Sequence, residues 1–192
     1  MSLPRGNVFL AGVGGQGILL ASEILSETFM LAGFDVKKSE IHGMSQRGGS
    51  VVSHVRYGRE VFSPIVPEGE GDILFGFELL ETCRYLSLLK KGATVIANDL
   101  CIPPPSVLSG KEVYPEGLTE KIGSLFPDFL LVDGLKLATE AGNPRAANTA
   151  LLGAVSKRLD IPEEFWMEAM AKMVPAKAIE VNRKAFLAGR NL

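Results

Sequence analysis

A glycine-rich turn between an apolar run and a helical segment constrains the fold of this chain most strongly. The turn reads Gly-Val-Gly-Gly-Gln-Gly over residues 12–17 and matches the pattern G-x-G-x-x-G. Asn7–Ala11 before it is a short apolar run typical of a buried strand, and Gln16–Ala32 after it has the apolar stripe of a helix. Glycines let the backbone approach a ligand closely, and the helix N-terminus offers N–H groups to an anion. The candidate binding residues of this turn are Gly12, Gly14, Gly15, Gln16 and Gly17.

The same pattern occurs in enzymes that bind a dinucleotide, where an acidic residue after the second strand binds the ribose. Glu40 has a suitable position, at the end of a second strand predicted over Phe34–Glu40. However, residues 42–49 continue as a polar loop and a hairpin, whereas a doubly wound dinucleotide-binding fold normally has a helix there. Three interpretations stay open: a dinucleotide site, a site for another phosphate-bearing ligand, and a tight turn whose helix N-terminus is empty or filled by a partner.

A second unusual segment, Ile41–Ser50, places a histidine, an arginine and three glycines within ten residues. Lys37 and Lys38 precede it, and His54 and Arg56 share one face of the following strand. This predicts a positive region at the carboxyl edge of the sheet, where such folds bind ligands, and arginine offers a planar fork to carboxylate or phosphate. A solvated loop, with His54 a strand residue that has an internal partner, is the alternative. The candidate residues here are His42, Ser45, Gln46, Arg47, Gly48, Gly49 and Arg56.

The rest of the chain alternates strands and helices. Ser50–Tyr57 has the period of a strand, and Glu60–Ser63 is predicted to return as its hairpin partner. The order predicts one α/β domain over residues 1–192: a three-layer, Rossmann-like sandwich with a mostly parallel sheet, a β-hairpin insertion and a helical C-terminal third. The other predicted strands are Asp72–Gly76, Ala93–Ala97, Glu112–Tyr114 and Phe129–Asp133, and the other helices are Glu78–Leu89 (closed by Lys90, Lys91 and Gly92), Leu118–Phe126, Arg145–Arg158, Pro162–Lys172 and Ala176–Leu187.

Composition and charge exclude several classes of function. The net charge of −2 argues against a nucleic-acid-binding protein, because phosphate backbones need a basic surface. Cys83 and Cys101 cannot hold an iron–sulfur cluster, which needs about four thiolates, and two histidines with scattered carboxylates predict no metal site. The N-terminus leaves no room for a signal peptide, and no apolar run approaches the roughly 20 residues of a membrane helix. We therefore expect a soluble, cytoplasmic protein.

Together, the two glycine-rich segments resemble a known family. Residues 12–17, followed by Gln-Arg-Gly-Gly at 46–49 and by Ser53-His54-x-Arg56, are similar to the gamma subunits of pyruvate and other 2-oxoacid:ferredoxin oxidoreductases. The form Ile-His-Gly-Met-Ser-Gln-Arg-Gly-Gly at 41–49 is most similar to the beta subunit of indolepyruvate ferredoxin oxidoreductase. The C-terminal third agrees with the family at Asn148–Ala154 and at Lys177, Asn182, Ala185, Phe186 and Gly189.

The resemblance implies a subunit of an enzyme that oxidatively decarboxylates a 2-oxoacid to an acyl-CoA and reduces ferredoxin. Thiamine diphosphate and [4Fe–4S] clusters would lie on a larger partner subunit, so this chain would hold no cofactor and be inactive alone. In fused relatives the equivalent domain lies beside the active site and is implicated in coenzyme A binding. That role carries over to Gly14, Gly15, Gln16, Arg47, Gly48, Gly49 and Arg56, and Asn148 joins the candidates.

No catalytic residue is assigned, and the particular 2-oxoacid stays open. Two alternatives also stay open beside the resemblance. One is a stand-alone dehydrogenase that binds NAD or FAD, although 192 residues leave little room for a second, substrate-binding domain. The other is a purely structural subunit whose glycine-rich loops pack against a larger chain without touching a ligand.

Overall fold

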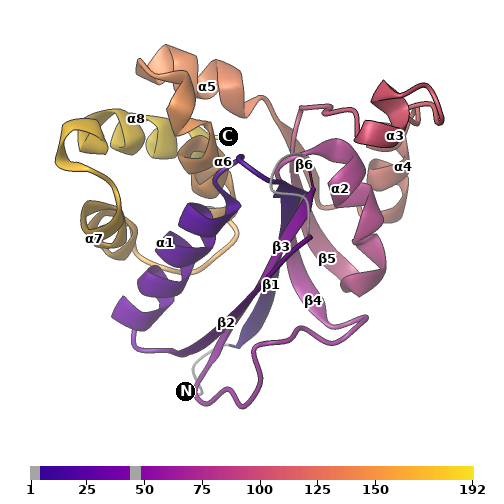
Figure 1. Ribbon diagram of the computed structural model, residues 1–192. Helices are drawn as coiled ribbons and strands as arrows, with labels where there is room; N and C mark the ends of the chain where they lie inside the picture. The colour runs from indigo at the N-terminus through magenta and orange to yellow at the C-terminus, as the bar shows by residue number, and fades with distance from the viewer. Residues whose placement is uncertain (1–4, 44–48) are drawn as a thin grey trace.

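The computed structural model describes residues 5–43 and 49–192, which form a six-stranded sheet between two helical layers (Figure 1). In the order β2-β3-β1-β4-β5-β6, strands β1, β4, β5 and β6 pair in parallel, whereas β3 runs antiparallel to both of its neighbours. The predicted α/β fold with a mostly parallel sheet is confirmed. The strands are β1 (Gly6–Val13), β2 (Asp35–His42), β3 (Ser50–Gly58), β4 (Gly71–Gly76), β5 (Leu89–Asn98) and β6 (Phe129–Val132).

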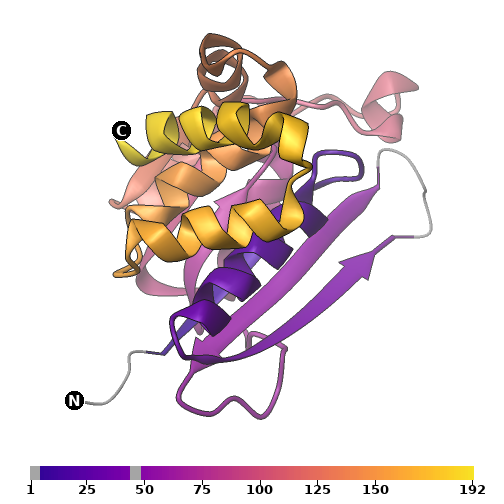
Figure 2. The same cartoon turned by 90° about the vertical axis from the view of Figure 1, so that its left-hand side faces the viewer.

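Helices cover both faces of this sheet. Strand β1 shows why: Val8 and Leu10 point into one hydrophobic core and Phe9 and Ala11 into the other, as the two-residue period of a strand dictates. α1, α6, α7 and α8 build the first core and α2 and α4 the second (Figures 1 and 2). The helices are α1 (Ile18–Leu31), α2 (Leu79–Arg84), α3 (Pro105–Leu108), α4 (Leu118–Leu125), α5 (Gly134–Ala141), α6 (Ala147–Ser156), α7 (Glu163–Met173) and α8 (Ile179–Arg190).

The hairpin of the sheet consists of β2 and β3, and the predicted pairing of Glu60–Ser63 with β3 is wrong. Strand β3 pairs along its length with β2 on one side and β1 on the other. Its central residues, Val52–Val55, are buried, so a place inside the sheet suits it better than a two-stranded ribbon. Residues 59–70 instead form a loop that leads to β4. The connection from β1 through α1 therefore leads to β2, which is separated from β1 in the sheet by β3.

Three local predictions need correction. The helix predicted at Glu78–Leu89 ends at Arg84, and a short 3-10 turn over Leu86–Leu88 leads directly into β5 at Leu89. Lys90 and Lys91 thus lie on a strand. Glu112–Tyr114 is not a strand but part of the connection from α3 to α4. Helix α5 was not expected, although Asp133 caps its N-terminus and Gly142 ends it in the left-handed conformation.

Candidate functional site

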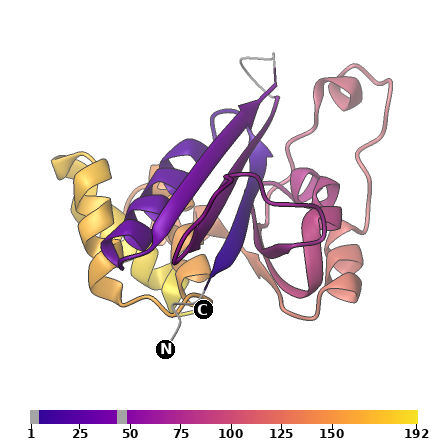
Figure 3. The ribbon, with the colours of Figure 1, turned by 90° about the horizontal axis from the view of Figure 1, so that it is seen from below.

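The two glycine-rich segments meet at the carboxyl edge of the sheet. The N–H of Gly14 donates a hydrogen bond of 2.9 Å to the carbonyl of Gly49, and Val13 is paired with Ser50 across the strands. The meeting follows from the topology, because the inserted strand β3 begins where β1 ends. Figure 3 shows the β2–β3 hairpin extending between α1 on one side and α2 on the other.

The first turn is held in shape by its own glutamine. Gln16 accepts a hydrogen bond from the Val13 N–H through Oε1 at 2.7 Å and donates from Nε2 to the Phe77 carbonyl at 2.8 Å. Its amide therefore supports the turn from inside. Gly15 and Gly17 have φ values of 99° and 81°, in the left-handed region that favours glycine. A Cβ on Gly15 would meet no atom within 4 Å, so its backbone is open to a ligand.

The side chain of Asn148 lies against this turn. A Cβ on Gly17, the N-cap of α1, would come within 2.6 Å of Asn148 Nδ2. Asn148 Oδ1 accepts from the Thr149 N–H at 2.9 Å, and Thr149 Oγ1 donates to Asn182 Oδ1 at 2.6 Å. The matching residues of the C-terminal third thus connect α6 and α8 to the N-terminus of α1.

Arg56 and His54 lie away from this edge. Arg56 donates from Nε to Asn7 Oδ1 at 2.8 Å and from Nη1 to the carbonyls of Ser63 and Ile65 at 3.1 and 3.2 Å. His54 Nδ1 accepts from the Val66 N–H at 3.1 Å, and burial lowers the pKa of its imidazole. Both side chains hold the 59–70 loop at the amino edge, so Arg56 is not brought to the glycine residues.

The positive region predicted around the second segment is partly neutralised. Lys37 pairs with Asp35 at 2.5 Å and Lys38 with Glu40 at 2.7 Å. Because β3 separates β2 from β1, Glu40 is not on the strand next to the glycine turn, which disfavours the dinucleotide interpretation. His42 is exposed at the end of β2. The candidates Ser45, Gln46, Arg47 and Gly48 lie outside the described residues.

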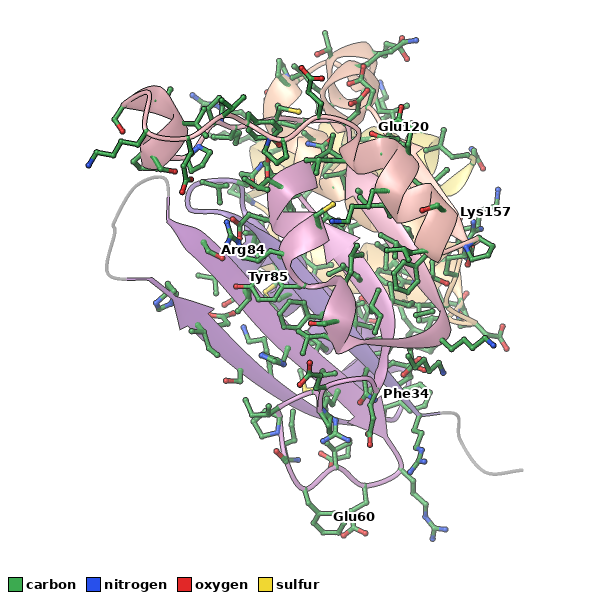
Figure 4. The ribbon with its side chains drawn as sticks, turned by 90° about the vertical axis from the view of Figure 1, so that its right-hand side faces the viewer. Phe34, Glu60, Arg84, Tyr85, Glu120 and Lys157 are labelled. Atoms are coloured by element: carbon green, nitrogen blue, oxygen red, sulfur yellow. The ribbon has the colours of Figure 1, made fainter. Side chains whose placement is uncertain are left out.

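A polar cluster on α2 completes the edge, and the sequence motifs missed it. The nearly buried Glu81 accepts from Ser50 Oγ through Oε2 at 2.5 Å and from Arg84 Nε through Oε1 at 3.2 Å. The Tyr85 hydroxyl lies 3.1 Å from Ser50 Oγ, and its ring packs on Phe9. Figure 4 shows Arg84 and Tyr85 on the same side of α2. The available signal was the helical spacing of Glu81, Arg84 and Tyr85 directly after a strand.

Metal and membrane functions gain no support from the described structure. Over residues 5–43 and 49–192, no three His, Cys, Asp or Glu side chains gather where they could hold a metal ion. Cys83 is half-buried and burial raises the pKa of its thiol, while Cys101 is exposed. Two thiols do not fit the four-thiolate requirement of a [4Fe–4S] cluster. Within the same residues, no helix is long and apolar enough to span a membrane.

The fold and the site define an α/β domain whose glycine turn faces an inserted antiparallel strand, unlike the doubly wound dehydrogenases. The chain belongs to the pyruvate ferredoxin/flavodoxin oxidoreductase family, whose model matches residues 7–192. It is thus a small subunit of the 2-oxoacid:ferredoxin oxidoreductase type, as the two motifs predicted, and a stand-alone dehydrogenase is not favoured.

Individual proteins agree with this family. The chain is 42% identical over 187 residues to the indolepyruvate oxidoreductase subunit IorB of Pyrococcus horikoshii, an alignment that covers 94% of this chain and 92% of that one. The pyruvate oxidoreductase subunit PORC of Thermotoga maritima has the same fold, with a TM-score of 0.71 at 20% identity and 100% and 97% of the two chains covered. The 2-oxoglutarate:ferredoxin oxidoreductase of Magnetococcus marinus superposes with a TM-score of 0.73 at 19% identity, over 97% of this chain and 30% of that one.

Proposed function

We propose that this chain is the small subunit of an enzyme that oxidises indolepyruvate or a related 2-oxoacid to its acyl-CoA and transfers the electrons to ferredoxin. The near-complete alignment with an indolepyruvate oxidoreductase subunit at 42% identity is the observation that supports it most. Thiamine diphosphate and iron–sulfur clusters, which this chemistry needs, would be held by a larger partner subunit. Two cysteines and the lack of a Gly-Asp-Gly thiamine motif in this sequence support that division.

Within that enzyme, we assign the carboxyl edge to the wall of the active site, in contact with coenzyme A. The hydrogen bond between Gly14 and Gly49 supports this assignment, because it joins both glycine segments beside the N-terminus of α1. Open backbone at Gly15 and the amide of Asn148 add polar groups there. Arg47 and its neighbours enter the proposal from the family resemblance alone. The fold also occurs in the Magnetococcus marinus enzyme, which was solved with 2-oxoglutarate, coenzyme A and succinyl-CoA bound.

Co-expression with the large subunit tests the function. The purified complex should reduce a redox dye only when both a 2-oxoacid and coenzyme A are present, and an aryl pyruvate should be among the accepted substrates. Neither protein alone should do so. A stable complex that is inactive with aryl, branched and simple 2-oxoacids would contradict the proposed function. A flavin spectrum, or a thermal shift with NAD, would instead revive the dehydrogenase alternative.

The part played by coenzyme A has a separate test. Arg47→Ala in the active complex should raise the KM for coenzyme A about tenfold or more, since an arginine–phosphate contact is among the stronger hydrogen bonds. Arg59→Ala, an exposed residue of the loop at the other edge, is the matched control. If the KM for coenzyme A stays at the wild-type value, Arg47 does not bind it. If alanine at Asn148 also leaves the KM for coenzyme A unchanged, the chain is better described as a purely structural subunit.

A further inference from the structure

We propose that Arg84 binds an oxyanion of the ligand at the carboxyl edge and that Glu81 is the positioning residue that holds Arg84 there. This inference rests on the proposed function, because it concerns the same edge. It adds a cation that neither glycine-rich motif contains.

The geometry of Arg84 leaves its binding face available. The side chain is 52% exposed and donates to Glu81 through Nε alone, at 3.2 Å. An arginine has four further N–H donors on its two Nη atoms, arranged as a planar fork. Among the described residues, these Nη atoms make no hydrogen bond within the chain. The guanidinium is therefore held through Nε, while its Nη atoms can donate to a carboxylate or a phosphate.

The carboxylate that holds Arg84 is fixed to the glycine junction itself. The side chain of Glu81 is only 9% exposed, and its second oxygen accepts from Ser50 Oγ at 2.5 Å. Ser50 directly follows Gly49, whose carbonyl accepts from the Gly14 N–H. One carboxylate thus connects the guanidinium to the point where both glycine segments meet. The Tyr85 hydroxyl, 3.1 Å from Ser50 Oγ, gives the serine a second partner.

This arrangement differs from an ordinary surface ion pair. An exposed pair gains little, because water screens both charges and both side chains stay mobile. Here the carboxylate is buried and both of its oxygens have a defined donor, so the guanidinium is placed before a ligand arrives. If residue 84 served only to neutralise the charge of Glu81, a lysine at this position would do so equally well. A planar fork is needed only if two oxygens of one ligand are to be bound together.

The chemistry of the ligand follows from the fork. Two substrates of the proposed reaction carry oxyanions: coenzyme A has phosphates and the 2-oxoacid has a carboxylate. The chemistry that they share is a pair of anionic oxygens on one group, which a planar guanidinium binds. The substrate whose KM responds to Arg84 identifies the source.

The first experiment measures KM for each substrate in the complex with the large subunit. Arg84→Ala should raise one of the two KM values about tenfold or more while kcat changes less than about threefold. Arg84→Lys should recover only part of the loss, because it restores the charge but not the fork. Arg183→Ala, an exposed arginine on α8, should leave both KM values unchanged. Wild-type KM values in Arg84→Ala, or full recovery in Arg84→Lys, would overturn the proposal.

A double-mutant cycle tests the positioning role of Glu81. Glu81→Ala should raise the same KM as Arg84→Ala, and the double variant should be no worse than the poorer single variant. Two effects that multiply would show that Glu81 does not act through Arg84.

A second measurement does not depend on the activity of the complex. With coenzyme A, inorganic phosphate and an aryl pyruvate as separate probes, at least one should raise the melting temperature of the full chain in the wild type and Arg183→Ala but not in Arg84→Ala. Equal shifts in all three proteins would overturn the role of Arg84. An inactive wild-type complex with an Arg84-dependent shift would contradict the proposed function and leave this inference supported.

Discussion

At the scale of single residues, His54 is held in its neutral form. Its ring is buried edge-on against Phe9, and Nδ1 must be unprotonated to accept the Val66 N–H. Burial accordingly lowers the pKa of His54 below the ordinary value of 6.5. Below that value the unfolded chain takes up a proton that the folded chain resists, so the free energy of unfolding falls as the pH decreases.

A substitution at His54 checks this titration. His54→Asn keeps an acceptor oxygen near the position of Nδ1 but cannot gain a proton in this range. We expect the wild type to lose more stability than His54→Asn between about pH 7.5 and pH 5.5, with a difference on the order of 1 kcal/mol. Urea unfolding at both pH values measures the difference. Identical pH dependence in the two proteins would show that His54 does not titrate on folding.

The site residues divide according to what the sequence can reveal. Gly14, Gly15 and Gly17 were found because a glycine turn between a strand and a helix is a local pattern. Arg56 was grouped with them because it is near in sequence, yet five residues of extended strand lie between it and Ser50. For Glu81 and Arg84, the sequence shows only their helical spacing. The contact that joins Glu81 to Ser50, thirty-one residues away, is encoded by no local pattern, so the pair was missed.

At the scale of elements, the crossing of α6 and α8 depends on two glycines. A Cβ on Gly153 would lie 2.0 Å from the Phe186 carbonyl oxygen, and one on Gly189 would lie 1.8 Å from that of Ala150. Both obstacles are backbone atoms, so side-chain rearrangement cannot relieve them. The two helices, which carry the Asn148–Asn182 network, are therefore as close as their backbones allow.

Alanine substitutions should reveal this close approach. Gly153→Ala should lower the free energy of unfolding by about 2–4 kcal/mol, because the overpacking exceeds the gain in helix propensity. Gly123→Ala in α4 is the matched control: its Cβ would make an ordinary contact of 3.6 Å with Phe129, and we expect a gain of about 0.5–1 kcal/mol. Chemical denaturation of both variants measures the contrast. A neutral Gly153→Ala would mean that the helices can separate at little cost.

Elements with a strong local pattern were predicted well, and those decided by pairing were not. The glycine turn, α1 and the C-terminal helices follow from periodicity and capping residues. The partner of β3 could not be predicted, because the periodicity of a strand does not say which neighbour supplies its hydrogen bonds. Likewise, no local pattern shows where α2 ends and β5 begins. Leu86 and Leu89 are buried apolar residues, which suit the inner face of a longer helix as well as a strand.

At the scale of the whole molecule, the candidate site and the 59–70 loop lie at opposite edges of the sheet. The carboxyl edge gathers the glycine turn, Asn148 and the Arg84 cluster, whereas the amino edge holds the 59–70 loop, with Glu60 at its far end (Figure 4). A hollow of about 580 Å³ beside this loop is lined by both acidic and basic residues, among them Arg56 and Lys90. Two residues of one sequence motif, Gly49 and Arg56, thus serve opposite edges of the same sheet.

The separation of the edges predicts where a loop variant will act. Arg56 donates to two carbonyls of the 59–70 loop, and Phe62 in that loop is 87% exposed. Arg56→Ala should therefore let the loop open more often, and chymotrypsin should cut after Phe62 several times faster than in wild type. Arg59→Ala, which removes an exposed charge from the same loop, should be cut at the wild-type rate. Equal rates in all three proteins would mean that other contacts, such as the Val66 N–H with His54, suffice to hold the loop.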